Sequence, residues 1–118
     1  MLFDNLNVWK KAHELTLSVY RITKKFPSNE IYGITSQLRR AMSSVPANIV
    51  EGQARRTSKE FMQFLVQARG SLAETQYFLI LSKDLEYISD KELDEMLKVS
   101  EDISRMLNSL INSVKLKC

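Results

Sequence analysis

The sequence contains few of the residues that interrupt, cross-link or anchor a chain. Its 118 residues include three glycines, two prolines, one histidine and one cysteine. So few glycines and prolines leave little room for turns, which favours a few long elements over many short ones. The cysteine, Cys118, cannot form an internal disulfide, and a single terminal thiol is typical of a reducing compartment.

Long apolar runs are also missing. No segment approaches the roughly 20 apolar residues that a membrane-spanning helix needs, and Met1–Asn5 lacks the basic-then-apolar layout of a secretory signal. The hydrophobic content of 44% is too high for a disordered chain. We therefore expect a soluble, cytoplasmic protein with one domain over residues 1–118 and no membrane partner.

The residue sets that enzymes use are absent as well. His13 and Cys118 are the only residues of their types, so the sequence offers no His/Cys metal cluster, and no Cys–His or Ser–His–Asp set beyond chance. Neither the Glu-x-x-His motif of di-iron bundles nor a glycine-rich phosphate loop occurs. Acidic residues gather late in the chain: Asp84, Glu86, Asp90, Glu92, Asp94, Glu95, Glu101 and Asp102. Their spacing matches no metal-ligand pattern, which favours a solvated acidic face over a divalent-ion site. We expect no enzymatic activity, no cofactor and no metal.

Apolar residues recur three and four positions apart along four segments, which predicts an all-α protein. The first helix is expected over about 5–25, stopped by Pro27, with a core stripe of Leu2, Leu6, Trp9, Ala12, Thr16, Val19, Thr23 and Phe26. The second is expected over about 32–54, kinked near Ser43 and Ser44 by Pro46. Its stripe is Ile31, Ile34, Leu38, Met42, Val45, Ile49 and Gly52.

Two capping boxes mark the starts of the last two helices: Thr57 with Glu60, and Ser89 with Glu92. Their inward residues are expected to be Phe61, Phe64, Leu65, Ala68, Leu72, Thr75, Leu79 and Ser82 in the third helix, and Leu93, Met96, Leu97, Ile103, Leu107, Leu110 and Val114 in the fourth. Short connections make sequential helices antiparallel neighbours, so the expected fold is an antiparallel, up-and-down four-helix bundle.

The third helix carries a second apolar strip on the side opposite its core stripe. The strip consists of Met62, Val66, Gly70, Ala73, Tyr77, Ile80 and Leu81. A surface helix normally has a polar back, and Gly70 in mid-helix costs about 1 kcal/mol relative to alanine. We interpret the strip as the interface of a homo-oligomer; the alternative is a central helix, or a strip covered by loops.

A polar ridge follows the second helix at helical spacing. Its members are Gln37, Arg40, Ser44, Asn48, Glu51 and Arg55. One interpretation is a hydrogen-bond network between helices or subunits, in which Glu51 pairs with Arg55 or Arg40. The others are a recognition surface and an ordinary solvated face.

Charge is divided unevenly along the chain, whose net charge is +3. Eleven basic and five acidic residues lie up to Arg69, whereas six basic and nine acidic residues follow Gly70. Arginine suits phosphate because its guanidinium offers a planar fork of donors. The candidate phosphate contacts are Arg39, Arg40, Arg55, Arg56, Lys59 and Arg69.

Several segments together are similar to one protein family: Phe3–Trp9, Phe26–Gly33, Gln37–Ala41, Ser44–Gly52 and Ala68–Glu74. The chain resembles the four-helix bundle proteins encoded in 23S rRNA intervening sequences, and also the accessory variability determinant proteins of diversity-generating retroelements. The resemblance implies a left-handed bundle assembled as a ring-shaped homopentamer. For the accessory proteins it also implies contact with nucleic acid and with a reverse transcriptase.

Residue by residue, the resemblance assigns Arg39, Arg40, Arg55 and Arg56 to a basic surface. Gln37, Ser44, Asn48, Glu51 and Glu74 fall among the polar residues of the family signature. The chain has Gln53-Ala54 where the family often has an aromatic residue followed by glycine.

Two non-enzymatic functions follow. The first is an oligomer that binds RNA or DNA through the phosphate backbone, because few exposed aromatics are available for base stacking. The second is an oligomeric scaffold with a polypeptide partner, in which the basic surface steers association.

Overall fold

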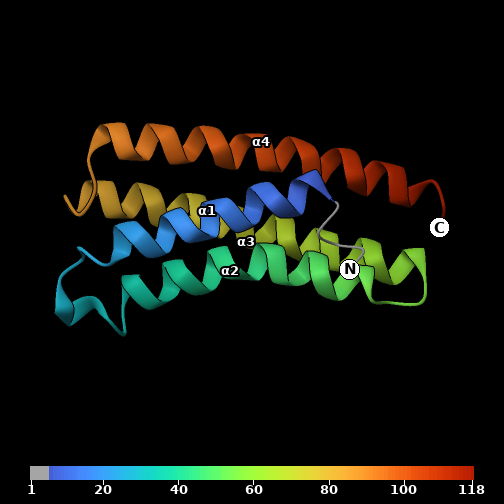
Figure 1. Ribbon diagram of the computed structural model, residues 1–118, viewed down its shortest axis with the longest axis horizontal. Coiled ribbons are helices and arrows are strands. Elements are labelled where there is room, and N and C mark those ends of the chain that lie inside the picture. The colour runs from blue at the N-terminus through green and yellow to red at the C-terminus, as the bar shows by residue number, and fades with distance from the viewer. Residues whose placement is uncertain (1–5) are drawn as a thin grey trace.

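The computed structural model describes residues 6–118 and contains four α-helices, as predicted (Figure 1). These are α1 (Asn7–Thr23), α2 (Ile34–Gln53), α3 (Ser58–Asp84) and α4 (Asp90–Lys115), with a short 3₁₀ segment η2 (Ser28–Glu30) between α1 and α2. The expected beginning of the first helix at residue 5, and Leu2 in its stripe, lie outside the described residues. Within residues 6–118, no helix combines the length and apolarity that crossing a membrane requires.

The helix starts follow their capping residues. At α4 both bonds of the predicted box form: Ser89 Oγ accepts from the Glu92 amide, and the Glu92 carboxylate accepts from the Ser89 amide. At α3 only half of the box forms. Thr57 Oγ1 accepts from the Glu60 amide at 3.1 Å, but the Glu60 carboxylate accepts from the Thr57 hydroxyl rather than from its amide. The reciprocal bond predicted there is therefore wrong, because the hydroxyl itself satisfies the carboxylate.

Pro46 lies inside α2 without ending it. The helix runs through this buried proline, as predicted. A proline removes one backbone hydrogen bond and crowds the preceding turn. In that turn the hydroxyls of Ser43 and Ser44 both donate to the Arg40 carbonyl, at 3.3 and 2.7 Å. The kink near these serines remains a prediction.

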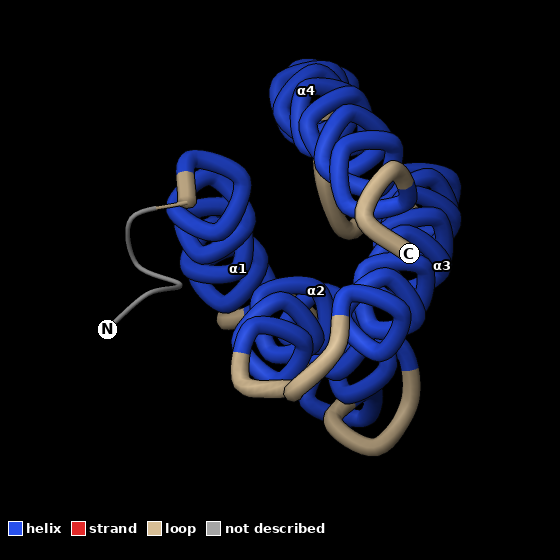
Figure 2. Tube along the Cα trace, turned by 90° about the vertical axis from the view of Figure 1, so that its right-hand side faces the viewer, coloured by secondary structure: helices blue, strands red, loops and turns tan. Residues whose placement is uncertain are grey.

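The helices follow one another around a single core, which Figure 2 shows along the bundle. α2 packs most extensively on α3, followed by α3 on α4, α1 on α2 and α1 on α4. Six of the seven residues predicted for the α2 stripe are buried, and only Ile31, which precedes the helix, is exposed.

The core face of α1 is displaced from the predicted one. Val8 and Leu15 are buried, whereas Trp9 is half-buried. In α4 the core also includes Ser100 and Ile111, while Leu93, Leu97 and Leu110 are half-buried. Phe61 and Phe64 of α3 are likewise only half-buried. A single three-and-four stripe is narrower than the face that a helix buries when it contacts two neighbours, which explains these differences.

Gly52 allows α2 and α3 to approach closely at one end of the bundle. A β-carbon at this position would lie 2.7 Å from Phe61 Cδ1 and 2.9 Å from Phe64 Cβ. Both separations are shorter than normal carbon–carbon contact, so a side chain here forces the helices apart.

We therefore expect Gly52→Ala to destabilise the protein although alanine is the better helix former. Overpacking costs typically 1–3 kcal/mol, and improved helix propensity returns about 1 kcal/mol. The check is urea unfolding of Gly52→Ala alone and together with Phe61→Leu, which shortens one clashing side chain. Recovery of part of the loss in the double variant is expected; a Gly52→Ala protein as stable as the native one would contradict the packing argument.

The α1–α2 and α3–α4 connections meet at the same end of the bundle, and the α2–α3 connection lies at the other (Figure 1). Tyr87 joins the first two: its hydroxyl donates to Glu30 Oε2 at 2.8 Å, and its ring packs on buried Phe26 with centroids 5.2 Å apart. Glu86 beside it adopts the left-handed conformation, with φ of 66°.

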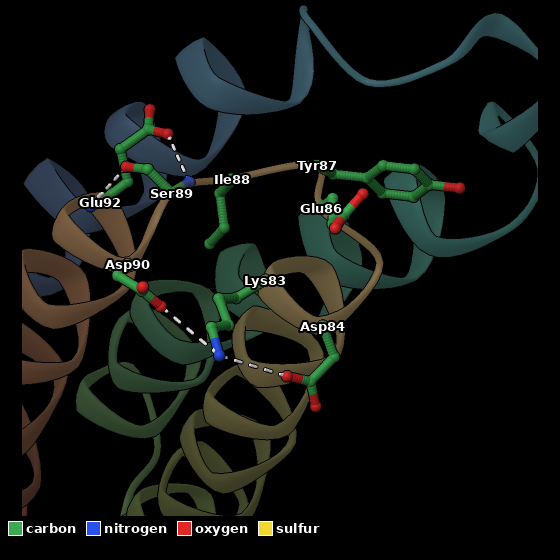
Figure 3. A pocket seen from close by; sticks show the side chains of 8 residues that line it. All are labelled: Lys83, Asp84, Glu86, Tyr87, Ile88, Ser89, Asp90 and Glu92. Atoms are coloured by element: carbon green, nitrogen blue, oxygen red, sulfur yellow. Dashed lines mark hydrogen bonds and ion pairs between the residues drawn. The ribbon is translucent and has the colours of Figure 1, made fainter.

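This corner holds a cavity of about 630 Å³. Figure 3 shows the side chains that line it: Lys83, Asp84, Glu86, Tyr87, Ile88, Ser89, Asp90 and Glu92. Lys83 Nζ lies between Asp90 at 3.4 Å and Asp84 at 3.6 Å, and these carboxylates raise the pKa of the lysine, the hydrogen bond with Asp90 most. The acidic residues of this corner therefore close the turn between α3 and α4.

The Tyr87–Glu30 bond is expected to give the fold a pH-dependent contribution. Its hydrogen bond to Glu30, together with burial and charge repulsion, raises the pKa of Tyr87. The stabilisation is therefore complete below the ordinary tyrosine pKa of about 10 and is lost as pH rises through the raised value. We expect native protein to melt higher than Tyr87→Phe at pH 8, with the difference shrinking above about pH 10. A difference that stays constant across this range would show that the bond contributes nothing.

Candidate subunit and nucleic-acid interfaces

The second apolar strip of α3 is exposed along most of its length. Val66, Tyr77 and Ile80 are 41%, 57% and 43% exposed, and Gly70 and Ala73 between them are also exposed. A β-carbon on Gly70 would find no atom within 4 Å. This exposure excludes the alternatives of a central helix or a covering loop within residues 6–118.

Two residues of the predicted strip belong elsewhere. Met62 and Leu81 are half-buried and pack against the core cluster. The exposed strip is therefore Val66, Gly70, Ala73, Tyr77 and Ile80, referred to below as the α3 strip. Its spacing of four, three, four and three keeps all five on one side of the helix.

The basic candidates do not form one surface. Arg39 is half-buried toward α1, where its Nε donates to Thr23 Oγ1 at 2.8 Å and its guanidinium lies 4.9 Å from the centre of the Tyr20 ring. Arg69 points toward α4 and donates to Asn108 Oδ1 at 3.1 Å. Both arginines thus connect helices of the same chain. Arg39 diverges from Arg40 because neighbouring residues on a helix point about 100° apart. The part of Arg39 and Arg69 in phosphate contact stays a prediction.

Arg40, the other arginine of this doublet, lies in a hollow between α2 and α3. The hollow has a volume of about 380 Å³ and is lined by Gln37, Arg40, Ala41, Ser44, Ser71, Glu74 and Phe78. Arg40 is exposed and makes no ion pair with any residue in 6–118, Glu74 included. Its guanidinium is free to bind an external anion.

Three further basic residues surround the connection between α2 and α3. The Arg55 guanidinium stacks 4.7 Å from the centre of the Phe64 ring, which holds the side chain in place while leaving the residue exposed. Arg56 and Lys59 are exposed and have no acidic partner in the described part of the chain. Arg55, Arg56 and Lys59 are referred to below as the turn cluster.

The polar ridge of α2 is bonded mainly to its own helix. Ser44 Oγ donates to the Arg40 carbonyl, and Asn48 Nδ2 donates to the Ser44 carbonyl, both at 2.7 Å. Glu51 makes no ion pair with Arg55, Arg40 or any other described residue, so the pairing is not formed within one subunit. Gln37 and Glu74 are exposed and contribute to the hollow that contains Arg40.

Sequence reasoning did not find the groove between α1 and α4. Some of its lining residues lie on helix faces beside the core stripes. Ile22 of α1 and Val99 of α4 are examples, and both are half-buried. No local signal distinguishes such residues from the edge of an ordinary core stripe.

Comparisons with known proteins agree with this architecture. The family model of the 23S rRNA-intervening sequence protein matches residues 4–109. A crystal structure of a protein of unknown function from the S23 ribosomal protein family of Bacteroides thetaiotaomicron superposes with a TM-score of 0.84 at 26% sequence identity, covering 93% of this chain and 98% of that one. No curated protein matches. The chain therefore belongs to the family of 23S rRNA-intervening sequence proteins.

Proposed function

We propose that this chain is the subunit of a non-enzymatic, cytoplasmic homo-oligomer, a ring of five, that binds the phosphate backbone of RNA or DNA. Each subunit would be an antiparallel, up-and-down, left-handed bundle. The alternation of its connections between the two ends of the molecule supports the antiparallel order (Figure 1).

The observation that carries the binding proposal is the set of basic residues left without internal partners. The turn cluster and Arg40 lie along α2 and its connection to α3, and none of them forms an ion pair within residues 6–118. Arg40 lies within α2, and the turn cluster follows the end of the same helix. A phosphate backbone running along α2 toward its connection to α3 would meet Arg40 first and then the turn cluster.

Assembly would strengthen such binding. Among the described residues, one subunit offers four free basic residues on this surface, and each phosphate contact is weak and salt-dependent. A ring repeats the same surface on every subunit, and linked sites bind a polyanion far more tightly than one site does. The α3 strip supports assembly, since five exposed small or apolar residues on one helix face are typical of a contact surface.

The test is light scattering coupled to size exclusion, with the native protein alone and mixed with a structured RNA or a DNA duplex. We expect a mass of several subunits, a shift with nucleic acid at 50 mM salt and release at 300 mM salt. An assembly whose mass does not change with either nucleic acid at low salt would contradict the binding proposal and favour a scaffold with a polypeptide partner.

A further inference from the structure

α1 and α4 leave an apolar groove along the seam between them. Near the end of α1, a cavity of about 370 Å³ has Leu15, Ile22, Met96 and Val99 among its lining residues. Near the start of α1, a second cavity of about 500 Å³ is lined by Leu6, Val8, Met106 and Leu110 together with polar residues. Figure 2 shows the seam from one end, with α1 and α4 on either side of it.

An ion pair crosses the seam between the two cavities. Lys11 Nζ lies 3.2 Å from Asp102 Oδ2, and both side chains are about two-fifths exposed. Lys11 lies one turn after Val8, and Asp102 one turn after Val99. The groove thus has an apolar cavity at each end and a polar bridge in the middle.

We propose that this groove holds the α3 strip of a second copy of the chain, an inference that rests on the proposed homo-oligomer. The side-chain sizes along the α3 strip match the groove, with larger residues at the ends and small ones in the middle. Val66 stands at one end, Tyr77 and Ile80 at the other, and Gly70 and Ala73 between them. Large side chains enter the two cavities, and the small residues let the helix backbone pass over the ion pair.

The lengths of strip and groove agree. Val66 and Ile80 are separated by as many residues as Val8 and Ile22 on α1. At 1.5 Å per residue both distances are about 21 Å. A helix docked parallel to α1 can therefore place the two ends of its strip in the two cavities at the same time.

The rims of the cavities fix the orientation. Glu14 and Glu95 line the cavity near the end of α1 and form no ion pair within residues 6–118. Their carboxylates can accept a hydrogen bond from the Tyr77 hydroxyl, which needs a partner when its ring is covered. Tyr77 and Ile80 therefore enter this cavity, and Val66 enters the one lined by Val8 and Met106.

Strip and groove are different surfaces of the same molecule, so the contact is head-to-tail. Such contacts repeat from subunit to subunit and generate a ring when the rotation closes. A two-fold contact between two α3 strips would stop at a dimer and would leave the groove empty.

The decisive experiment is complementation between two damaged subunits. Val66→Glu breaks the strip, and Ser18→Arg with Ser109→Arg places a long charged side chain in each cavity. Each variant alone is expected to be a monomer.

An equimolar mixture is expected to form a complex of twice the 13.7 kDa subunit mass by native mass spectrometry, because one intact strip meets one intact groove. A groove variant that still assembles as the native chain does would overturn the inference while leaving the proposed oligomer standing. A monomeric native protein would overturn both.

Cysteine cross-linking is the alternative test if circular dichroism shows that the groove variant is unfolded. In a Cys118→Ser background, Ala73→Cys paired with Glu14→Cys is expected to give a ladder of disulfide-linked subunits under mild oxidation. A pair that remains unlinked in an assembled protein would overturn the inference. Dimers formed by Ala73→Cys alone would also overturn it, because they indicate a strip-to-strip contact.

Discussion

Val66→Glu is expected to convert the assembly into a folded single subunit. Val66 is 41% exposed in one chain, so a glutamate there is hydrated and changes the stability of the isolated fold little. In a subunit contact the same carboxylate loses its water without gaining a partner, which costs several kcal/mol. At about 1.4 kcal/mol per tenfold change, each contact weakens by a factor of 100 or more. Light scattering at micromolar protein concentration measures the outcome.

The matched control is Leu17→Glu. Leu17 on α1 is 44% exposed, nearly the same as Val66, and does not line the seam groove. The Leu17→Glu substitution makes the same apolar-to-acidic change at nearly equal exposure. We expect Leu17→Glu to assemble normally. If both variants dissociate, added charge rather than the strip is responsible; if neither does, the strip is not the interface.

The triple variant Arg40→Ala/Arg55→Ala/Arg56→Ala is expected to lose nucleic-acid binding while remaining assembled. Each phosphate contact contributes about 0.9 to the slope of log K against log salt on duplex DNA. Removing three contacts per binding unit lowers that slope by about 2–3 and the affinity at low salt by about 100-fold or more. Fluorescence anisotropy with a labelled duplex over a range of salt concentrations gives both quantities.

A charge-matched control separates position from total charge. Lys91, Lys98 and Lys115 are exposed residues of α4 outside the proposed surface. Lys91→Ala/Lys98→Ala/Lys115→Ala removes the same charge and is expected to bind almost as the native protein does. Equal losses in both variants would mean that net charge, not the turn cluster and Arg40, determines binding.

Arg39 offers a further contrast within one doublet. Because it bonds Thr23 and stacks on Tyr20, its role is to join α1 to α2, while its neighbour Arg40 has no side-chain partner among residues 6–118. Sequence alone treats the two arginines as equivalent. Only the positions of the neighbouring helices decide which one is available to a ligand.

The sequence by itself determined the number and approximate extent of the helices. Local features were sufficient: the three-and-four spacing of apolar residues, the stop at Pro27, and the caps at Thr57 and Ser89. These signals act between residues a few positions apart, and for that reason they can be read without a structure. The same periodicity located the α3 strip, because a second apolar face is also a property of one helix.

The tertiary structure decided everything that depends on two helices at once. It moved the core face of α1 from Trp9 to Val8 and Leu15, and it assigned Met62 and Leu81 to the core rather than to the strip. It also separated Arg39 and Arg69 from the free basic residues and produced the groove between α1 and α4. Burial, arginine pairing and grooves depend on how far each helix is rotated and how closely its neighbour approaches, and no local pattern specifies either quantity.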